Sequence, residues 1–340
     1  MSVAIAGVEP FFSGPYAPCP TPMGGSFSST RSSVSSSPAS SSAPSSSSSA
    51  SAFSAASSSA LSSNTVAGPA CRFVPPESTG PGTPVVLPTF RIVSYYGSPL
   101  SPLMGILGEY PMDEMFKKLD AQAAVYQQLD PSRPVLRAAE IIAVVAEASP
   151  GPYGTYAADL SAAMIDQYAA ATRARGDLLI LDVQVGRSSI ESQVKNMMPY
   201  LAFPNVELAL DPEFDMGPGQ IPGVEIGSIK TSDINWTIQQ LSNLVRQDDL
   251  PQKVLIVHQF LPGMFPGWQD VKPAPGVAFV TDTDGFGTQV EKIDNYDRYI
   301  AGQPIQGFGG MKLFYKWDVN MMTPQEVLAL KPSPSLIIYQ

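Results

Sequence analysis

The sequence predicts an α/β fold, a (β/α)8 barrel of the TIM type, preceded by a disordered Ser-rich leader. Eight short apolar runs alternate with helix-like segments over the last 250 or so residues, which is the number and order of elements in one barrel domain. Five of these runs, between Leu178 and Asp318, end directly in acidic or other reactive residues. Since the carboxyl ends of parallel strands meet at one rim, where barrel enzymes hold their chemistry, the pattern also bears on function.

The chain before the barrel has a composition that disfavours a folded core. Residues 26–63 are almost entirely Ser and Ala, and Pro and Gly punctuate residues 64–88. Such a segment buries too little apolar surface to offset the conformational entropy lost on ordering. We therefore expect a disordered Ser/Ala/Pro-rich leader or tether over residues 1–88 and a barrel domain over residues 89–340.

The expected strands are apolar runs bounded by Gly, Pro or acidic residues, and the expected helices have caps or an apolar stripe. Ser188 is the expected N-cap of one helix, with Glu191 as its capping-box partner, and Thr323 to Glu326 mark another helix start. We expect strands at 90–96, 139–145, from 178, from 206, at 254–258, 277–282, 311–315 and 336–339, and helices at 112–129, 161–173, 188–200, 232–246, near 294–300 and from 323. An open doubly wound sheet is the runner-up, but no early strand is followed by a Gly-rich phosphate turn.

The net charge and the length of the apolar segments exclude some classes of partner. The net charge of −10 lies in the barrel part, because the two acids and two bases of residues 1–80 cancel. An acidic domain without a Lys/Arg cluster is poorly suited to bind a phosphate backbone, so we expect no nucleic-acid partner. We expect no transmembrane segment, since no segment is apolar for long enough. The oligomeric state stays open.

Both cysteines, Cys19 and Cys71, lie in the leader, so we expect no disulfide, Cys-bound metal or thiol nucleophile in the barrel. The leader is rich in Ser and poor in acids. We expect a secreted or cell-envelope-tethered, lipoprotein-like protein, although neither cysteine has the flanking residues of a lipoprotein signal. Organellar import is the alternative.

Alternation along the strands sorts the rim residues, because side chains two residues apart share a face. From these pairs and from the aromatic residues of the rim, we expect the following substrate-binding side chains: Asp182, Gln184, Asp282, Asp284, Lys316, Asp318, Tyr96 and Trp268. For any one acid, a helix N-cap or an ion pair is an equal alternative. The aromatic residues either stack on sugar rings or cover the top of the core.

The sharpest motif is Asp211-Pro212-Glu213, followed by Phe214. A glycosidase needs one carboxyl group held protonated, to donate to the leaving oxygen, and a second that stays charged beside the oxocarbenium-like transition state. We expect Glu213 to be the proton donor and Asp211 the charged partner. The alternative is that Asp211 pairs with Lys316 while Glu213 caps a turn.

His258 is the single histidine of the chain and ends an apolar strand. It is either a catalytic residue, acting as a general base or hydrogen-bond donor near neutral pH, or a hydrogen-bonded core residue. Together with the acids of the rim it also forms an oxygen-rich set that suits Mg²⁺, Ca²⁺ or Mn²⁺. No local ligand spacing supports a metal, so we expect no cofactor and keep a divalent metal as an alternative.

Several runs resemble a group of uncharacterised, exported bacterial barrel proteins with Ser- or Pro-rich leaders. The runs are YYGSPL (95–100), MGILGE (104–109), LDVQVGRS (181–188), LDPEF (210–214), INW (234–236), DGFG (284–287) and KLFYK (312–316). The resemblance spans nearly all of residues 90–340 and implies the barrel fold without an activity. More broadly, the sequence is similar to barrel glycoside hydrolases whose fourth strand ends in Asp-x-Glu, which is an analogy of fold and strand-end acids.

The expected function is therefore a glycoside hydrolase-like barrel that acts on a carbohydrate by carboxylate general acid/base chemistry. Two alternatives stay open. One is a non-catalytic barrel that binds a glycan or a cell-wall component. The other is a metal-dependent hydrolase.

Overall fold

The computed structural model of the chain describes residues 85–301 and 307–340. The leader expected over residues 1–88 lies outside the described residues except for 85–88. Within this short piece, Val86 and Leu87 are buried, and their backbone N–H groups donate to Gln252 Oε1 at 3.0 and 2.8 Å. Packing of the barrel therefore begins before Phe90.

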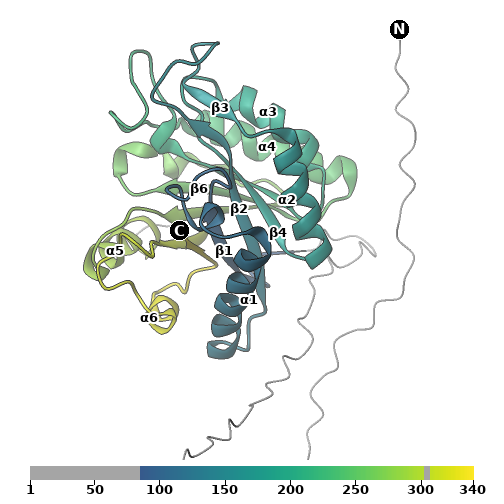
Figure 1. The fold of residues 1–340 in the computed structure, drawn as a ribbon, viewed down its shortest axis with the longest axis vertical. Coiled ribbons are helices and arrows are strands. Elements are labelled where there is room, and N and C mark those ends of the chain that lie inside the picture. Colours follow the sequence, from purple (N-terminus) through teal and green to yellow (C-terminus); the bar gives the residue numbers. More distant parts are fainter. Residues whose placement is uncertain (1–84, 302–306) are drawn as a thin grey trace, which may run out of the picture. The chain divides into compact units, whose positions relative to one another are not determined.

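The eight strands of the expected barrel are present, and they close into a parallel sheet (Figure 1). They are β1 (Arg91–Gly97), β2 (Val135–Ala146), β4 (Leu178–Val183), β5 (Val206–Leu210), β6 (Lys253–Gln259), β7 (Val277–Thr283), β8 (Phe308–Leu313) and β9 (Leu336–Tyr339). Closure follows because β1 pairs in parallel with both β2 and β9. A short extra strand, β3 (Ala157–Asp159), runs antiparallel to the end of β2. The predicted fold class is confirmed.

Helices follow most of the barrel strands, as predicted. They are α1 (Met112–Leu129), α2 (Ala162–Arg175), α3 (Ile190–Leu201), α4 (Thr231–Asp248), α5 (Gln289–Tyr296) and α6 (Pro324–Ala329). The capping box of Thr323 and Glu326 is present. The cap predicted for α3 is wrong by one residue: Ser189 accepts from the Ser192 N–H, while the Ser188 hydroxyl donates to the Val185 carbonyl. The helix near 294–300 starts earlier, because a capping box at Thr288 begins α5.

Two apolar clusters lie on the two faces of the sheet, one inside the barrel and one outside it. One fills the lower part of the barrel interior and includes Ile92, Ile180, Ile256 and Val280, with Val86 and Leu87 at its base. The other packs the outer face of the sheet against the helices. Towards the carboxyl ends of the strands, the inward positions become polar and charged, and this change of character places the candidate site.

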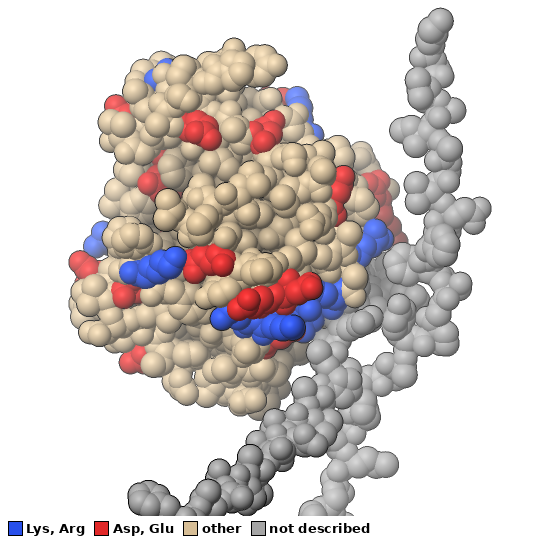
Figure 2. All heavy atoms as spheres, viewed as in Figure 1, with Lys and Arg blue, Asp and Glu red and all other residues tan. Residues whose placement is uncertain are grey.

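Among the described residues, no helix combines the length and the apolar character that a bilayer span requires. On the face shown in Figure 2, basic side chains lie beside acidic ones. Among the described ion pairs, Arg137 and Arg175 each pair with Asp120 and Asp177. The absence of a nucleic-acid partner stays a prediction.

Gly186 follows β4 in a left-handed conformation (φ +62°), and a Cβ atom there would collide with the backbone oxygen of Tyr156. Gly151 has nearly the same φ (+61°), but no atom lies within 4 Å of its Cβ position. We expect Gly186→Ala to lower the free energy of unfolding by about 3 kcal/mol and the matched control Gly151→Ala by about 1 kcal/mol. Urea denaturation measures both, and equal losses would contradict the close approach at Gly186.

Candidate active site at the barrel mouth

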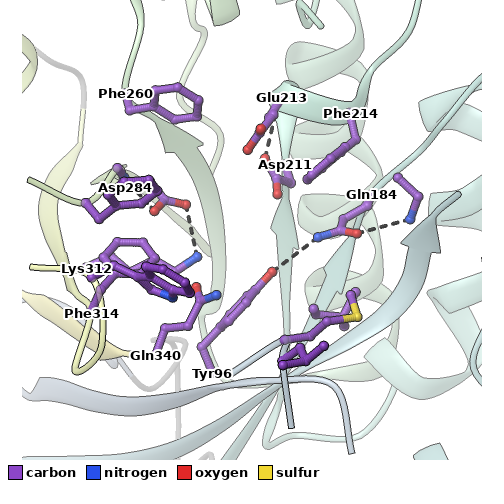
Figure 3. Close-up of a pocket in the computed structure, with 17 residues that line it drawn as sticks. Tyr96, Gln184, Asp211, Glu213, Phe214, Phe260, Asp284, Lys312, Phe314 and Gln340 are labelled. Atoms are coloured by element: carbon purple, nitrogen blue, oxygen red, sulfur yellow. Dashed lines mark hydrogen bonds and ion pairs between the residues drawn. The ribbon is translucent and has the colours of Figure 1, made fainter. Parts of the chain in front are cut away.

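A pocket of about 450 Å³ opens at the carboxyl ends of the barrel strands. In Figure 3, Asp211 and Glu213 lie on one wall and Asp284 and Lys312 on the facing wall, with Tyr96 from β1 between them. The aromatic residues that line the pocket further are Phe214, Phe260, Phe286, Phe314 and Trp317. The mouth thus combines carboxyl groups, one ammonium group and a largely aromatic rim.

Asp211 directly follows β5, and its Oδ1 accepts the Glu213 N–H at 3.2 Å, which caps the single turn Pro212–Phe214. The residue is only 4% exposed, and no hydrogen bond to Oδ2 occurs within the described parts of the chain. Burial first, and then the nearby charge of Asp182, raise the pKa of Asp211 well above its usual value. This shift favours the neutral form of the carboxyl group, which has one O–H to offer to the pocket.

Glu213 lies one short turn further out and is half-buried. Within residues 85–301 and 307–340, its carboxylate takes part in no ion pair or side-chain hydrogen bond. Burial raises its pKa, and the charge of Asp284 adds to that shift. The alternative pairing of Asp211 with Lys316 does not form, because Lys316 Nζ contacts Glu109 Oε1 at 2.7 Å.

On the facing wall, Lys312 of β8 places its Nζ 3.0 Å from Asp284 Oδ2 and 3.7 Å from the centre of the Tyr96 ring. Burial alone would raise the pKa of Asp284, but the Lys312 ammonium and His258 outweigh it and bring the pKa below its usual value. Burial alone would lower the pKa of Lys312. The surrounding carboxylates, Asp284 most of all, outweigh burial and raise the pKa above its usual value. Asp284 and Lys312 are therefore a charged pair.

His258 lies beneath the pocket and is 0% exposed. Its Nδ1 is 3.0 Å from Asp282 Oδ2 and its Nε2 is 3.1 Å from Glu140 Oε1. Burial lowers the pKa of His258, but the hydrogen bonds to Asp282 and Glu140 outweigh burial and raise it well above its usual value. Both ring nitrogens thus face carboxylates, and this arrangement suits a doubly protonated ring that donates on both sides. Such a ring has no free lone pair to act as a base.

Asp182 of β4 completes this buried layer. Its Oδ2 accepts the Tyr96 hydroxyl at 2.8 Å, and that hydroxyl accepts Gln184 Nε2 at 3.3 Å. Gln184 is fixed in turn by the Ala146 N–H, which donates to its Oε1 at 3.0 Å. Burial raises the pKa of Asp182 to about 6, although the charge of His258 opposes the shift.

The residues expected from the sequence fall into three groups. The pocket brings together Asp211, Glu213, Gln184, Asp284 and Tyr96, whereas His258, Asp182 and Asp282 lie in the layer beneath it.

The structure places the other three expected residues elsewhere. Lys316 is exposed and pairs with Glu109, and Asp318 accepts the N–H groups of Phe314 and Gly287 and contacts Lys292. Trp268 packs against the outer apolar cluster, so it does not line the pocket.

Sequence reasoning missed Glu140 and Lys312. The strand expected at 311–315 ends at Leu313, so alternation places Lys312 inside the barrel and leaves Lys316 beyond the strand. Glu140 is the single acid within the apolar strand β2. An isolated charge in an apolar run was the signal that could have found it.

The donor set of a metal site is partly present, because atoms of His258, Asp282 and Asp284 lie within 4.8 Å of one another. A metal ion binds the neutral imidazole, whereas here both ring nitrogens face carboxylates and the Lys312 ammonium already contacts Asp284. These residues fit a protonated histidine and a lysine better than they fit a divalent ion.

The charge of His258 is directly measurable, because the chain has one histidine. In ¹⁵N-histidine-labelled protein without a tag, we expect both ring nitrogens to be protonated at neutral pH, since Asp282 and Glu140 accept from them. In urea the same residue should titrate near its ordinary value of about 6.5. This ion-paired stabilisation is complete below that value and is lost as the pH rises through the raised folded-state pKa. A neutral ring in the folded protein at pH 7 would contradict the assignment.

Comparison with known proteins adds little. No protein-family model matches the chain, and no curated protein matches it. Among solved structures, a GH18 chitinase from Pseudoalteromonas aurantia is similar to it at 10% sequence identity and a TM-score of 0.27, over 73% of this chain and 93% of that one. A likeness this low supports no argument about function, and the barrel fold rests on the strand pairing itself.

Proposed function

We propose that the protein is a glycoside hydrolase-like enzyme that cleaves a glycosidic bond by carboxylate acid/base chemistry. One observation carries the proposal. Asp211 and Asp284 face each other across the pocket (Figure 3), and their surroundings shift their pKa values in opposite directions. The reaction needs one carboxyl group that tends to stay protonated and one that tends to stay charged, and opposite pKa shifts favour this division.

In this proposal Asp211 donates the proton to the leaving oxygen, because its raised pKa favours the neutral carboxyl group and its Oδ2 has no partner among the described residues. Asp284, held ionised by Lys312, stabilises the positive charge that develops on the sugar ring. Water then adds to the sugar carbon and gives up a proton to the Asp211 carboxylate, which restores the starting state. The proposal therefore transfers the donor role from Glu213, where the sequence placed it, to Asp211. No cofactor takes part.

The carbohydrate assignment rests on the rim. Phe286 is 65% exposed and Trp317 is 58% exposed, and their ring centres lie 6.1 Å apart beside the pocket. Exposed apolar patches of this kind mark ligand-binding surfaces, and flat aromatic faces match the apolar C–H faces of sugar rings. A non-catalytic glycan-binding barrel would use the same rim, and the two functions separate by whether product is released.

We expect Asp211→Asn to lower kcat on a cleaved glycan by about a thousandfold, because the proton donor is lost. The asparagine keeps the neutral charge and the shape of the group, so the circular dichroism spectrum should be unchanged. Release of reducing ends from a glycan panel measures the rate. Asp248→Asn, at the exposed end of α4, is the control and should retain full activity. An Asp211→Asn protein with wild-type turnover would remove Asp211 from the mechanism.

The pH profile of the wild type should be a bell. The rate falls as the pH rises through the raised pKa of Asp211, which must be protonated, and falls as the pH drops through the lowered pKa of Asp284, which must be charged. Lys312→Met removes the main group that lowers the pKa of Asp284, so the acidic limb of kcat/KM should move to higher pH. Lys316→Met, which loses only the exposed pair with Glu109, should leave that limb in place. An unmoved acidic limb in folded Lys312→Met protein would contradict the role of Asp284.

A further inference from the structure

The mouth carries more acids than its own cations can neutralise. In the described residues, its carboxyl groups are Glu140, Asp182, Asp211, Glu213, Asp282 and Asp284, and its cations are His258 and Lys312. The buried Lys292 lies nearby, and a further acid, Asp318, pairs with it at 3.5 Å. Even with Asp211 neutral, the acids outnumber the cations. Walls of low dielectric constant focus such an imbalance into the cavity, so the pocket favours positive ligands and disfavours negative ones.

Both cations are already engaged by specific carboxylates. His258 is held by Asp282 and Glu140, and Lys312 is held by Asp284 at 3.0 Å. Glu213 is the pocket carboxylate that has no partner of its own among the described residues, and Figure 3 places it on the wall beside Asp211. A half-buried carboxylate without a partner is costly, and a donor from the ligand would remove that cost.

The pocket also shows how it accommodates an ammonium group. The Lys312 ammonium lies 3.7 Å from the centre of the Tyr96 ring and 5.4 Å from that of Phe314. Aromatic faces attract cations by their quadrupole, and Phe214 stands next to Glu213 in the chain and in the pocket wall. A second ammonium group, brought by a ligand, would meet a carboxylate and an aromatic face in the same way.

We propose that the glycan bound here carries a free amine, as in a 2-amino-2-deoxy sugar, and that Glu213 is the carboxylate that binds its ammonium group. The proposal rests on the glycosidase function proposed above and names its substrate class. It assigns the three pocket carboxyl groups separate roles: Asp211 donates the proton, Asp284 stays charged beside Lys312, and Glu213 selects the sugar. It also excludes uronic acids, whose carboxylates the mouth repels.

Small matched ligands test this without any assumption about linkage. The probes are the methyl glycosides of glucosamine, glucose and glucuronic acid, in both anomers, titrated by NMR into the full-length chain. We expect one glucosaminide to bind about fivefold or more tightly than the corresponding glucoside at low salt, with the advantage shrinking as salt is added. The glucuronide should bind more weakly than the glucoside.

Two variants locate the effect. Glu213→Gln removes the charge with little change in shape and should abolish the preference for glucosaminide over glucoside. Asp248→Asn removes one exposed charge at the far end of α4 and should keep the preference. If the Glu213→Gln protein fails to fold, the wild-type ratios and their salt dependence still decide the question.

The failures of the two proposals are distinguishable. Equal affinities for glucosaminide and glucoside, a glucuronide that binds as well as either, or no binding of the glucosaminide would overturn the amine proposal. If neutral glycans are nevertheless cleaved through Asp211, the glycosidase function stands alone. If no glycan is cleaved by the wild type, the function itself falls.

Discussion

The two hydrogen bonds that join the His258 ring to Asp282 and Glu140 are the interaction on which the rest of the pocket mouth depends. The barrel interior changes from apolar side chains to a layer of carboxyl groups that is closed to water. Leaving one such carboxylate without a partner costs about 3–5 kcal/mol in a buried pair. A single imidazolium with two N–H donors satisfies one carboxylate on β2 and another on β7, and so joins opposite parts of the barrel at the depth where the pocket begins.

The same buried charges then give the carboxyl groups of the pocket above them different pKa values. Asp182 lies close enough to raise the pKa of Asp211, whereas His258 and Lys312 lower the pKa of Asp284. The layer thus shifts the pKa values of two carboxyl groups in one cavity in opposite directions. Asp282 Oδ1 and Asp182 Oδ1 are buried without a hydrogen-bond partner among the described residues.

The sequence predicted the fold and the rim because both follow from local pattern. Alternation correctly placed Asp182 with Gln184 and Asp282 with Asp284 on inward faces, since each pair lies on or directly after a regular strand. It failed at β8, because the strand expected at 311–315 ends at Leu313 and begins earlier, at Phe308. Gly310 is in fact a strand residue whose side-chain space is taken by Asp282, because a Cβ there would lie 2.7 Å from Asp282 Oδ1. That contact joins two strands, so no local pattern reports it. Lys312 was missed because the expected strand ran on to residue 315, which favoured Lys316 on the same face.

The pKa of each pocket carboxyl group depends on how deeply its side chain is buried. The sequence Asp211-Pro212-Glu213 does not reveal which of the two acids lies deeper. Asp211 and Glu213 follow the same strand and share one short turn, yet Asp211 faces the buried layer while Glu213 reaches the open wall. Desolvation and the charge of Asp182 therefore act mainly on Asp211. Glu213, further from that layer, faces the open pocket. In the proposed function this order places the donor Asp211 deepest and the unpaired Glu213 nearest the solvent, so an incoming ammonium group would meet Glu213 before it reached Asp211.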